Sequence, residues 1–204
     1  MRKQGGHWQQ VPHYLFGLSA VGLALYFLLA HPREPVIFFA SLFFLVICTT
    51  DTILSKIPNL ATLVLVLVGF GYHLLSGGLP GGATALAGML TGLALLLLPY
   101  LLGGMGAGDV KALAALGCLL GPVDIVQVFL FTGLIGGAMA LVHLAVSPHL
   151  KSRLRSWLAA ASQVIRGLGL PRREAGAAES RIKYPYGSAI AFGFFTFVNW
   201  GGLL

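Results

Sequence analysis

Charged side chains are scarce in this sequence of 204 residues, and acidic side chains are the scarcest. Charged residues make up 9% of the chain and hydrophobic residues 57%, and the mean hydropathy is +0.86. A soluble globular domain carries about 25% charged residues, so this composition excludes that class and indicates an integral membrane protein. The longest polar stretch, roughly 148–182, is shorter than the ~50 residues of a small separate domain. We therefore expect a single membrane domain over residues 1–204.

Cysteine is nearly absent as well. Cys48 and Cys118 each lie in an apolar run, and the chain contains no CxxC pair. Neither a disulfide framework nor a zinc site is therefore indicated, and we expect both cysteines to be small core residues. The histidines show no close-spaced ligand pattern either. We expect no metal and no cofactor.

Apolar runs fill most of the sequence, separated by proline, glycine or charge. They lie near 14–30, 36–50, 60–76, 84–102, 109–120, 125–146 and 184–203. A spanning helix needs about 20 residues, so the second and fifth runs look short. No small-residue cleavage site follows the first run, which favours a retained span over a signal peptide. The predicted fold is an all-α, polytopic bundle of about seven transmembrane helices, with an extra first span at 14–30 and a core at 36–204.

Lysine and arginine are distributed unevenly around these runs, and such residues favour the cytoplasmic side of short loops. If the chain has seven spans and a cytoplasmic N-terminus, Arg33 is the one lysine or arginine on the non-cytoplasmic side of the membrane. The cytoplasmic segments hold Arg2, Lys3, Lys56, Lys111, Lys151, Arg153, Arg155, Arg166, Arg172, Arg173, Arg181 and Lys183. The net charge of +7 therefore indicates membrane topology and affinity for anionic lipid headgroups, not nucleic-acid binding.

The cytoplasmic loop 148–182 contains a basic amphipathic pattern. Apolar residues recur at helical spacing, with basic residues between them, at Leu154, Trp157, Leu158, Ala161, Ile165 and Leu168. The pattern predicts a helix lying on the inner leaflet. Such a helix can anchor the protein or guide a substrate, and we favour anchoring.

Four of the six acids have ordinary surroundings. Glu174 and Glu179 lie in the polar loop, and Glu34 and Asp124 lie in turns beside prolines. The other two, Asp51 and Asp109, are set in apolar segments, where a carboxylate is costly and marks a functional site by default. On the seven-span topology Asp51 closes the second span and Asp109 opens the fifth, so both lie at the cytoplasmic face.

Two carboxylates brought together can activate a water molecule. Repulsion between two nearby negative charges makes it costly to ionise both carboxyl groups, so one is held protonated while the other stays charged. The ionised member can deprotonate water while the protonated member polarises or protonates a carbonyl. The pair titrates jointly, so base and acid are not assigned individually.

The residues around each aspartate allow a structural explanation beside the functional one. Asp109 follows four glycines in six residues and precedes a helix, so it can be a catalytic group or merely a helix cap. Lys111 is either an anchor at the membrane interface or an electrostatic tuner. Pro58 fits the first turn of the third helix, and Asn59 can cap that helix or bond locally.

Three motifs, in order along the chain, resemble a known family. They are D-x5-I-P-N from Asp51 to Asn59, G-x-G-D-x-K-x2-A-x2-G-x3-G from Gly106 to Gly121, and Y-P-Y-G-S-A from Tyr184 to Ala189. Together they resemble the type IV prepilin peptidases, which are intramembrane aspartyl proteases of the GxGD type.

This resemblance implies an endopeptidase of the bacterial inner membrane that removes the leader of prepilins or pilin-like secretion subunits at the cytoplasmic face, without a metal. Asp51 and Asp109 would be the catalytic pair. The residues implied to shape the site or bind the substrate are Lys56, Pro58, Asn59, Gly106, Gly108, Lys111, Pro185 and Gly187. The CxxC-containing insertion of the larger members is missing, so N-methyltransferase activity is not expected. The chain is more similar to the compact, peptidase-only branch that serves Flp/Tad-type pili, with its first span added to a six-span core.

Other functions stay open at this point. A small proton- or cation-coupled transporter could use the same two aspartates, although both lie at one face. A catalytically silent scaffold for pilus assembly is disfavoured by the intact pair. Presenilin-type proteases share GxGD but lack the D-x5-I-P-N element and carry a Pro-Ala-Leu motif that is missing here. The sequence leaves open the oligomeric state, the identity of the pilin, and whether the pair is assembled without substrate.

Overall fold

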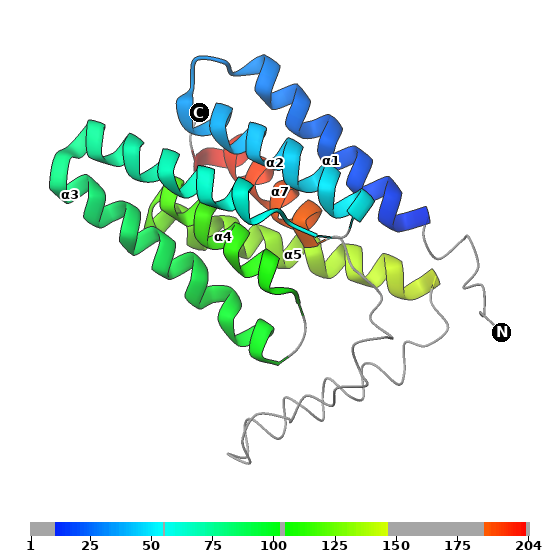
Figure 1. The fold of residues 1–204 in the computed structure, drawn as a ribbon. Coiled ribbons are helices and arrows are strands. Elements are labelled where there is room, and N and C mark those ends of the chain that lie inside the picture. Colours follow the sequence, from blue (N-terminus) through cyan, green and yellow to red (C-terminus); the bar gives the residue numbers. More distant parts are fainter. Residues whose placement is uncertain (1–10, 55, 103–104, 147–185, 203–204) are drawn as a thin grey trace, which may run out of the picture.

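The computed structural model describes residues 11–54, 56–102, 105–146 and 186–202, and every element within these ranges is helical (Figure 1). The elements are α1 (Val11–Ala30), α2 (Pro35–Leu54), α3 (Asn59–Leu101), α4 (Ala107–Leu120), α5 (Pro122–Val146), α7 (Tyr186–Phe197) and the π-helical turn η3 (Val198–Gly202). The predicted all-α fold is confirmed for these residues. The amphipathic helix predicted in loop 148–182, and Pro185, lie outside the described residues and stay predictions.

α3 is a helical hairpin. The backbone of Gly78 has φ 60° and ψ −145°, a conformation that glycine adopts far more readily than other residues. Pro80 follows and lacks the N–H needed to continue a hydrogen-bond ladder. The second arm returns beside the first (Figure 1), and Gly81 packs so closely on the His73 carbonyl oxygen that a methyl group would overlap it. The two arms correspond to the apolar runs expected near 60–76 and 84–102.

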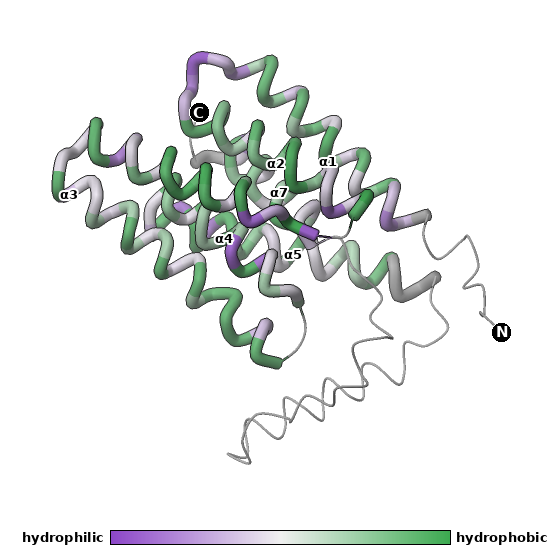
Figure 2. Tube along the Cα trace, in the orientation of Figure 1, coloured by the Kyte–Doolittle hydropathy of each residue, from purple (hydrophilic) through white to green (hydrophobic). Residues whose placement is uncertain are grey.

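Four helices in the described ranges are long and apolar enough to cross a membrane: α1, α2, α3 and α5. Figure 2 shows apolar residues along all the helices, with polar colour in the α1–α2 turn and between α2 and α3. α4 and α7 have 14 and 12 residues, fewer than the ~20 of a typical span. The chain is thus a membrane protein built from apolar helices, and α4 is as short as the sequence predicted.

The second apolar run, near 36–50, predicts a helix shorter than the one in the structure. α2 has 20 residues and continues through Asp51 to Leu54, beyond the apolar run 36–50. The hydroxyls of Thr49, Thr50 and Thr52 donate to carbonyl oxygens four residues earlier, at 2.7, 3.0 and 2.6 Å. These polar side chains satisfy their hydrogen bonds within the helix, so the helix does not end where hydropathy falls.

α4 is the central helix of the bundle, and its residues 110 and 112–120 are all buried. α3 approaches it through glycines, because the side chains of larger residues would collide with the α4 backbone. Gly69 faces Cys118, Gly88 faces Gly117, and Gly92 faces Leu113. Small residues allow such close contact between helices in membranes. The short α4, which carries Asp109, is therefore held firmly by the α3 hairpin.

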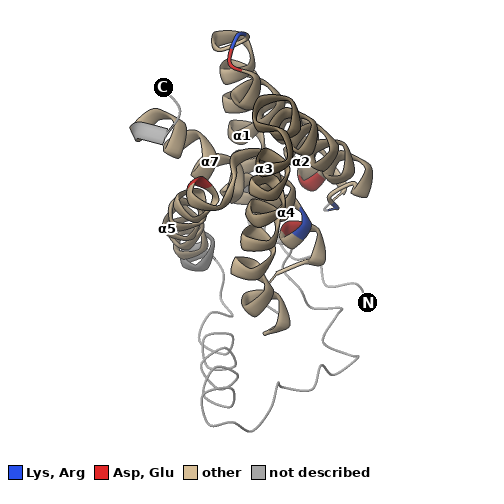
Figure 3. Cartoon of the chain, turned by 90° about the vertical axis from the view of Figure 1, so that its left-hand side faces the viewer, with Lys and Arg blue, Asp and Glu red and all other residues tan. Residues whose placement is uncertain are grey.

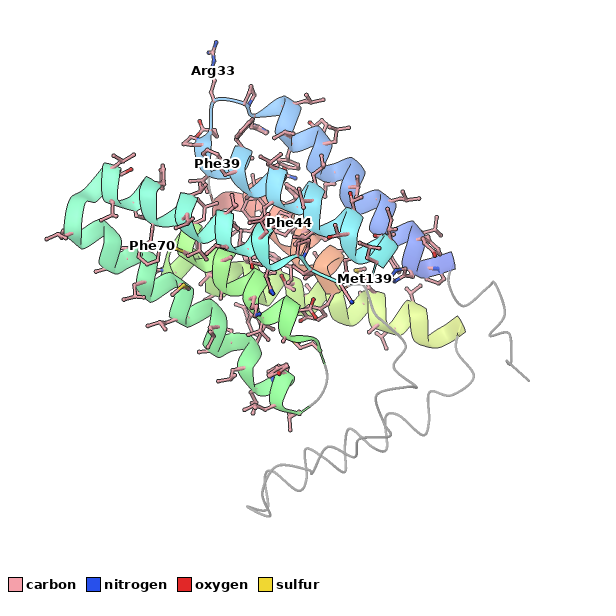
Figure 4. The ribbon with its side chains drawn as sticks, viewed as in Figure 1. Arg33, Phe39, Phe44, Phe70 and Met139 are labelled. Atoms are coloured by element: carbon pink, nitrogen blue, oxygen red, sulfur yellow. The ribbon has the colours of Figure 1, made fainter. Side chains whose placement is uncertain are left out.

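An aromatic cluster joins α1, α2 and α7. The rings of Phe27 and Phe195 stack with centroids 4.6 Å apart, and Phe44, which Figure 4 shows in the interior, lies 5.5 Å from Phe194. α2 and α7 are antiparallel, so Phe44–Phe194 and the pair Asp51–Gly187 lie about two turns apart along the same interface. The cluster sets the register that brings the start of α7 to Asp51.

Successive helices alternate in direction, so the connections gather at two ends of the bundle (Figure 1). The end of α2 and the starts of α3, α4 and α7 lie at one end, here called the motif end. The α1–α2 turn, the Gly78 turn and Gly121 lie at the opposite end, where Arg33 points away from the bundle (Figure 4). All three sequence motifs thus have described residues at the motif end.

Candidate active site

Asp51 lies in the last turn of α2, with a side chain that is only 8% exposed. The start of α7 covers it. A Cβ atom added to Gly187 would lie 3.1 Å from Asp51 Oδ2, so the backbone of α7 lies closer to the carboxylate than a residue with a side chain would ordinarily allow. The sequence predicted that Gly187 shapes the site, and the structure places it in contact with Asp51.

Asp109 lies in the first turn of α4 and is half-buried. Its Oδ2 accepts a hydrogen bond of 3.0 Å from the backbone N–H of Gly106, the residue that precedes the helix. This is the reciprocal half of a capping box: the N-cap is Gly106, and Asp109 supports the helix start from its third position. The bond also fixes the carboxylate at the positive end of the helix dipole, where negative charge is stabilised. Capping and a catalytic role are therefore compatible.

The two aspartates come together although the whole of α3 separates them in the sequence. α2, α4 and α7 contact one another, and Asp51 and Asp109 are close enough for their charges to interact. Tyr186, the first residue of α7, also lies close enough to Asp109 to be affected by its charge. In Figure 3 the acidic positions of α2 and α4 lie near each other, while those of the α1–α2 turn and of α5 lie elsewhere in the bundle. The structure thus assembles one acidic pair beneath the start of α7.

The two motifs that carry the aspartates are also in direct contact. Lys111 Nζ donates a hydrogen bond of 3.0 Å to Asn59 Oδ1. A Cβ atom on Gly108 would lie 3.2 Å from that of Ile57, so the glycine allows the α4 start to pack on the α2–α3 connection. Lys111 is therefore bonded to the other motif, an arrangement that neither of its two sequence interpretations included.

Two predictions for the start of α3 need correction. Pro58 has an extended backbone, with φ −65° and ψ 128°, and precedes the helix instead of lying in its first turn. Asn59 is the first residue of α3 and not its cap, and among the described residues its side-chain oxygen accepts from Lys111 on α4 instead of bonding locally. Asn59 and Lys111 lie far apart in the sequence, so the residues around Asn59 did not indicate this contact. Lys56 is exposed in the connection between α2 and α3, and within the described residues no ion pair joins it to an acid.

Two neighbours of Asp51 were not predicted as site residues. The Cys48 thiol, one helical turn before Asp51, lies 3.8 Å from the Gly187 carbonyl oxygen and donates to it. The buried side chain of Ser188 contacts the same thiol. Cys48 is a core residue, as expected, but it is also part of the site wall. The spacing of three residues between Cys48 and Asp51 was the available signal, since it places both on one helix face.

A comparison of the sequence with protein-family models gives a match. The family model described as the type IV leader peptidase family matches residues 37–141, which is more than half of the chain. The chain belongs to the type IV leader peptidase family. No curated protein and no solved structure matched it.

Family membership makes the protein a peptidase, and its apolar helices make it a membrane protein. The matched range contains both aspartates and the α3 hairpin, whereas α1 and α7 lie outside it. The resemblance drawn from the three motifs is thus confirmed at the level of the family. Within the described residues no three His, Cys, Asp or Glu side chains gather as a metal site requires.

Proposed function

We propose that this member of the type IV leader peptidase family is an aspartyl endopeptidase that removes the leader of type IV prepilins or pilin-like subunits. Asp51 and Asp109 are the catalytic pair. The observation that supports this assignment is their convergence, from α2 and α4, onto one site that the start of α7 covers. Of the remaining acids in the described residues, Glu34 lies in the connection between α1 and α2, and Asp124 lies in the first helical turn of α5 instead of in a loop.

The chemistry follows from two carboxylates that share one proton. The ionised carboxylate takes a proton from a water molecule as the water oxygen attacks the scissile carbonyl carbon, and the protonated carboxylate gives its proton to the carbonyl oxygen. The tetrahedral intermediate then collapses. The carbon–nitrogen bond breaks as the protonated carboxylate gives its proton to the leaving nitrogen and the ionised carboxylate takes a proton from a hydroxyl of the intermediate, so the pair again shares one proton.

The neighbouring residues position these groups. Gly108 allows the start of α4 to pack on the α2–α3 connection, and the N–H of Gly106 holds the Asp109 carboxylate in place. Gly187 allows α7 to close over Asp51. Lys111 and Asn59 join the two motifs. We assign Lys56 and Pro58, in the connection between α2 and α3, to shaping this site, and we assign Pro185 to the same role from its place in the third motif alone.

The proposed topology has seven membrane crossings, with the motif end in the cytoplasm of a bacterial cell. Support comes from the alternating helices of the bundle and from charge. Lys56 and Lys111 belong to the motif end, and Arg33 lies at the other end. Cytoplasmic loops are enriched in Lys and Arg. A leader that remains in the cytoplasm would then meet the pair as the apolar segment behind it enters the bilayer.

The decisive experiment follows cleavage of a purified prepilin by the protein reconstituted in liposomes, with the new N-terminus determined by sequencing. Asp51→Asn and Asp109→Asn should each lower the cleavage rate by at least about 100-fold, since each removes a proton-transfer group. Asp124→Asn, in the first turn of α5, is the matched control and should cleave like the wild type. Full activity in either of the first two variants would contradict the assignment.

The same liposomes test the alternative function. A transporter that uses the two aspartates would move protons or cations without cutting the prepilin, and its flux would disappear in Asp51→Asn. Family membership favours the peptidase, so we expect cleavage and no flux that depends on Asp51.

A further inference from the structure

α1 lies outside the range that matches the family, yet it contacts the residue next to Asp51. His13 Nε2, on the first turns of α1, is 3.2 Å from the backbone oxygen of Thr52. One turn further along α1, Gly17 packs so tightly on the Thr52 hydroxyl that a methyl group at Gly17 would overlap it. Both contacts are made to a single residue of α2.

The direction of the hydrogen bond is fixed by its chemistry. A carbonyl oxygen only accepts, so His13 Nε2 carries the hydrogen. The Nδ1 atom is buried and has no hydrogen-bond partner among the described residues. A lone pair at that position is less costly to bury than an N–H without a partner. The surroundings therefore favour the Nε2–H tautomer, which is the one that can donate to Thr52.

The accepting carbonyl is one that a helix cannot satisfy by itself. The last four carbonyl groups of an α-helix have no N–H partner four residues further on, and α2 ends at Leu54. The carbonyl of Thr52 belongs to this group, and His13 supplies its donor. The Thr52 hydroxyl meanwhile donates to the Cys48 carbonyl at 2.6 Å. Both polar groups of Thr52 thus help to hold the turn that contains Asp51.

We propose that His13 is a positioning residue for Asp51, and that α1 is thereby part of the catalytic apparatus of this chain. His13 caps the C-terminal turn of α2 from the neighbouring helix, and Gly17 sets the distance at which it does so. The consequence for catalysis depends on the proposed function, because it assumes that Asp51 must be held in place to react. The consequence for the structure of α2 does not.

The test compares His13→Ala and His13→Gln in the full chain, reconstituted in lipid nanodiscs. Glutamine places an amide N–H near the position of Nε2 and should keep the bond, whereas alanine removes it. Hydrogen–deuterium exchange of residues 49–54 measures the stability of the last turn of α2. We expect exchange to rise by about three- to tenfold in His13→Ala, the effect of losing one hydrogen bond, and to return close to the wild-type rate in His13→Gln.

Prepilin cleavage provides the second readout. His13→Ala should lower kcat by about tenfold, since a small misplacement of a reacting group is costly, with KM unchanged and with recovery in His13→Gln. His73→Ala is the matched control. His73 Nε2 bonds the Leu119 carbonyl at 3.1 Å, the same type of contact at a different interface, and its loss should change neither kcat nor exchange at residues 49–54. If His13→Ala does not fold, His13→Asn replaces it, because its amide is too short to reach Thr52.

The outcomes separate this proposal from the proposed function. Unchanged exchange at residues 49–54 in His13→Ala overturns the proposal. Raised exchange with an unchanged kcat also overturns it, while the peptidase assignment stands. A wild-type protein that cleaves no prepilin removes the proposed function, and the exchange experiment then still decides whether His13 stabilises the end of α2.

Discussion

At the residue scale, the missing side chain of Gly187 is a structural requirement of the candidate site. A Cβ atom there would lie 3.1 Å from Asp51 Oδ2, closer than ordinary van der Waals contact. Gly187→Ala should therefore displace the carboxylate by a few tenths of an ångström. We expect cleavage to fall by about 10- to 100-fold, the range produced by small misplacements of reacting groups, as measured by prepilin processing in liposomes.

The control for this substitution is another glycine in a helix. Gly133, in α5, has no atom within 4 Å of the position of an added Cβ, so Gly133→Ala should leave cleavage unchanged. Thermal unfolding in detergent should show both variants folded. A Gly187→Ala enzyme as active as the wild type would mean that α7 does not need to approach Asp51 so closely.

At the element scale, one hydrogen bond joins the two segments that follow the aspartates. Lys111→Met removes the donor to Asn59, which releases the α4 start from the α2–α3 connection. Both side chains are exposed, so the net stabilisation is at most about 1 kcal/mol, and cleavage should fall by up to about fivefold. Asn59→Asp should retain activity, since a carboxylate oxygen accepts equally well and also attracts the ammonium group.

A double-mutant cycle separates this bond from other roles of Lys111. If the bond is what matters, Lys111→Met combined with Asn59→Leu should be no slower than either single variant, because the same interaction is removed once. Strictly additive losses would show that the two residues act independently, with Lys111 acting on the pair by its charge.

Much of this arrangement could be predicted from residues close together in the sequence. Hydropathy located the helical segments, and the break between 76 and 84 anticipated the turn at Gly78. The isolation of Asp51 and Asp109 among apolar residues indicated the two acids that the structure brings together as a candidate site. Hydropathy failed at the end of α2, where threonine hydroxyls bond within the helix and extend it to Leu54.

Contacts between distant segments could not be predicted in this way. Asn59 looked like a helix cap because its local neighbours suggested one, whereas its partner is Lys111. Cys48 was predicted only as a core residue, because a single sequence does not reveal that Gly187 and Ser188 pack against it. His13 gave no signal at all. An apolar helix with one histidine does not indicate which carbonyl group the histidine meets.

At the scale of the whole molecule, the proposed function requires that the motif end face the cytoplasm, where a prepilin leader would lie. Arg33 in the α1–α2 turn and Lys56 after α2 are separated by the 20 residues of α2, enough for one crossing. Cysteine labelling tests this arrangement. Arg33→Cys should react with a membrane-impermeant maleimide in intact spheroplasts, whereas Lys56→Cys should react only after the membrane is permeabilised.

The native chain provides the control for this labelling. Cys48 and Cys118 are both 0% exposed, so the protein without an added cysteine should remain unlabelled under both conditions. Reaction of both introduced cysteines in intact spheroplasts would mean that α2 does not cross the membrane. The reverse pattern, with Lys56→Cys accessible from outside and Arg33→Cys protected, would place Asp51 and Asp109 on the far side from the leader. Either result would contradict leader cleavage at the cytoplasmic face, however well the two aspartates are arranged.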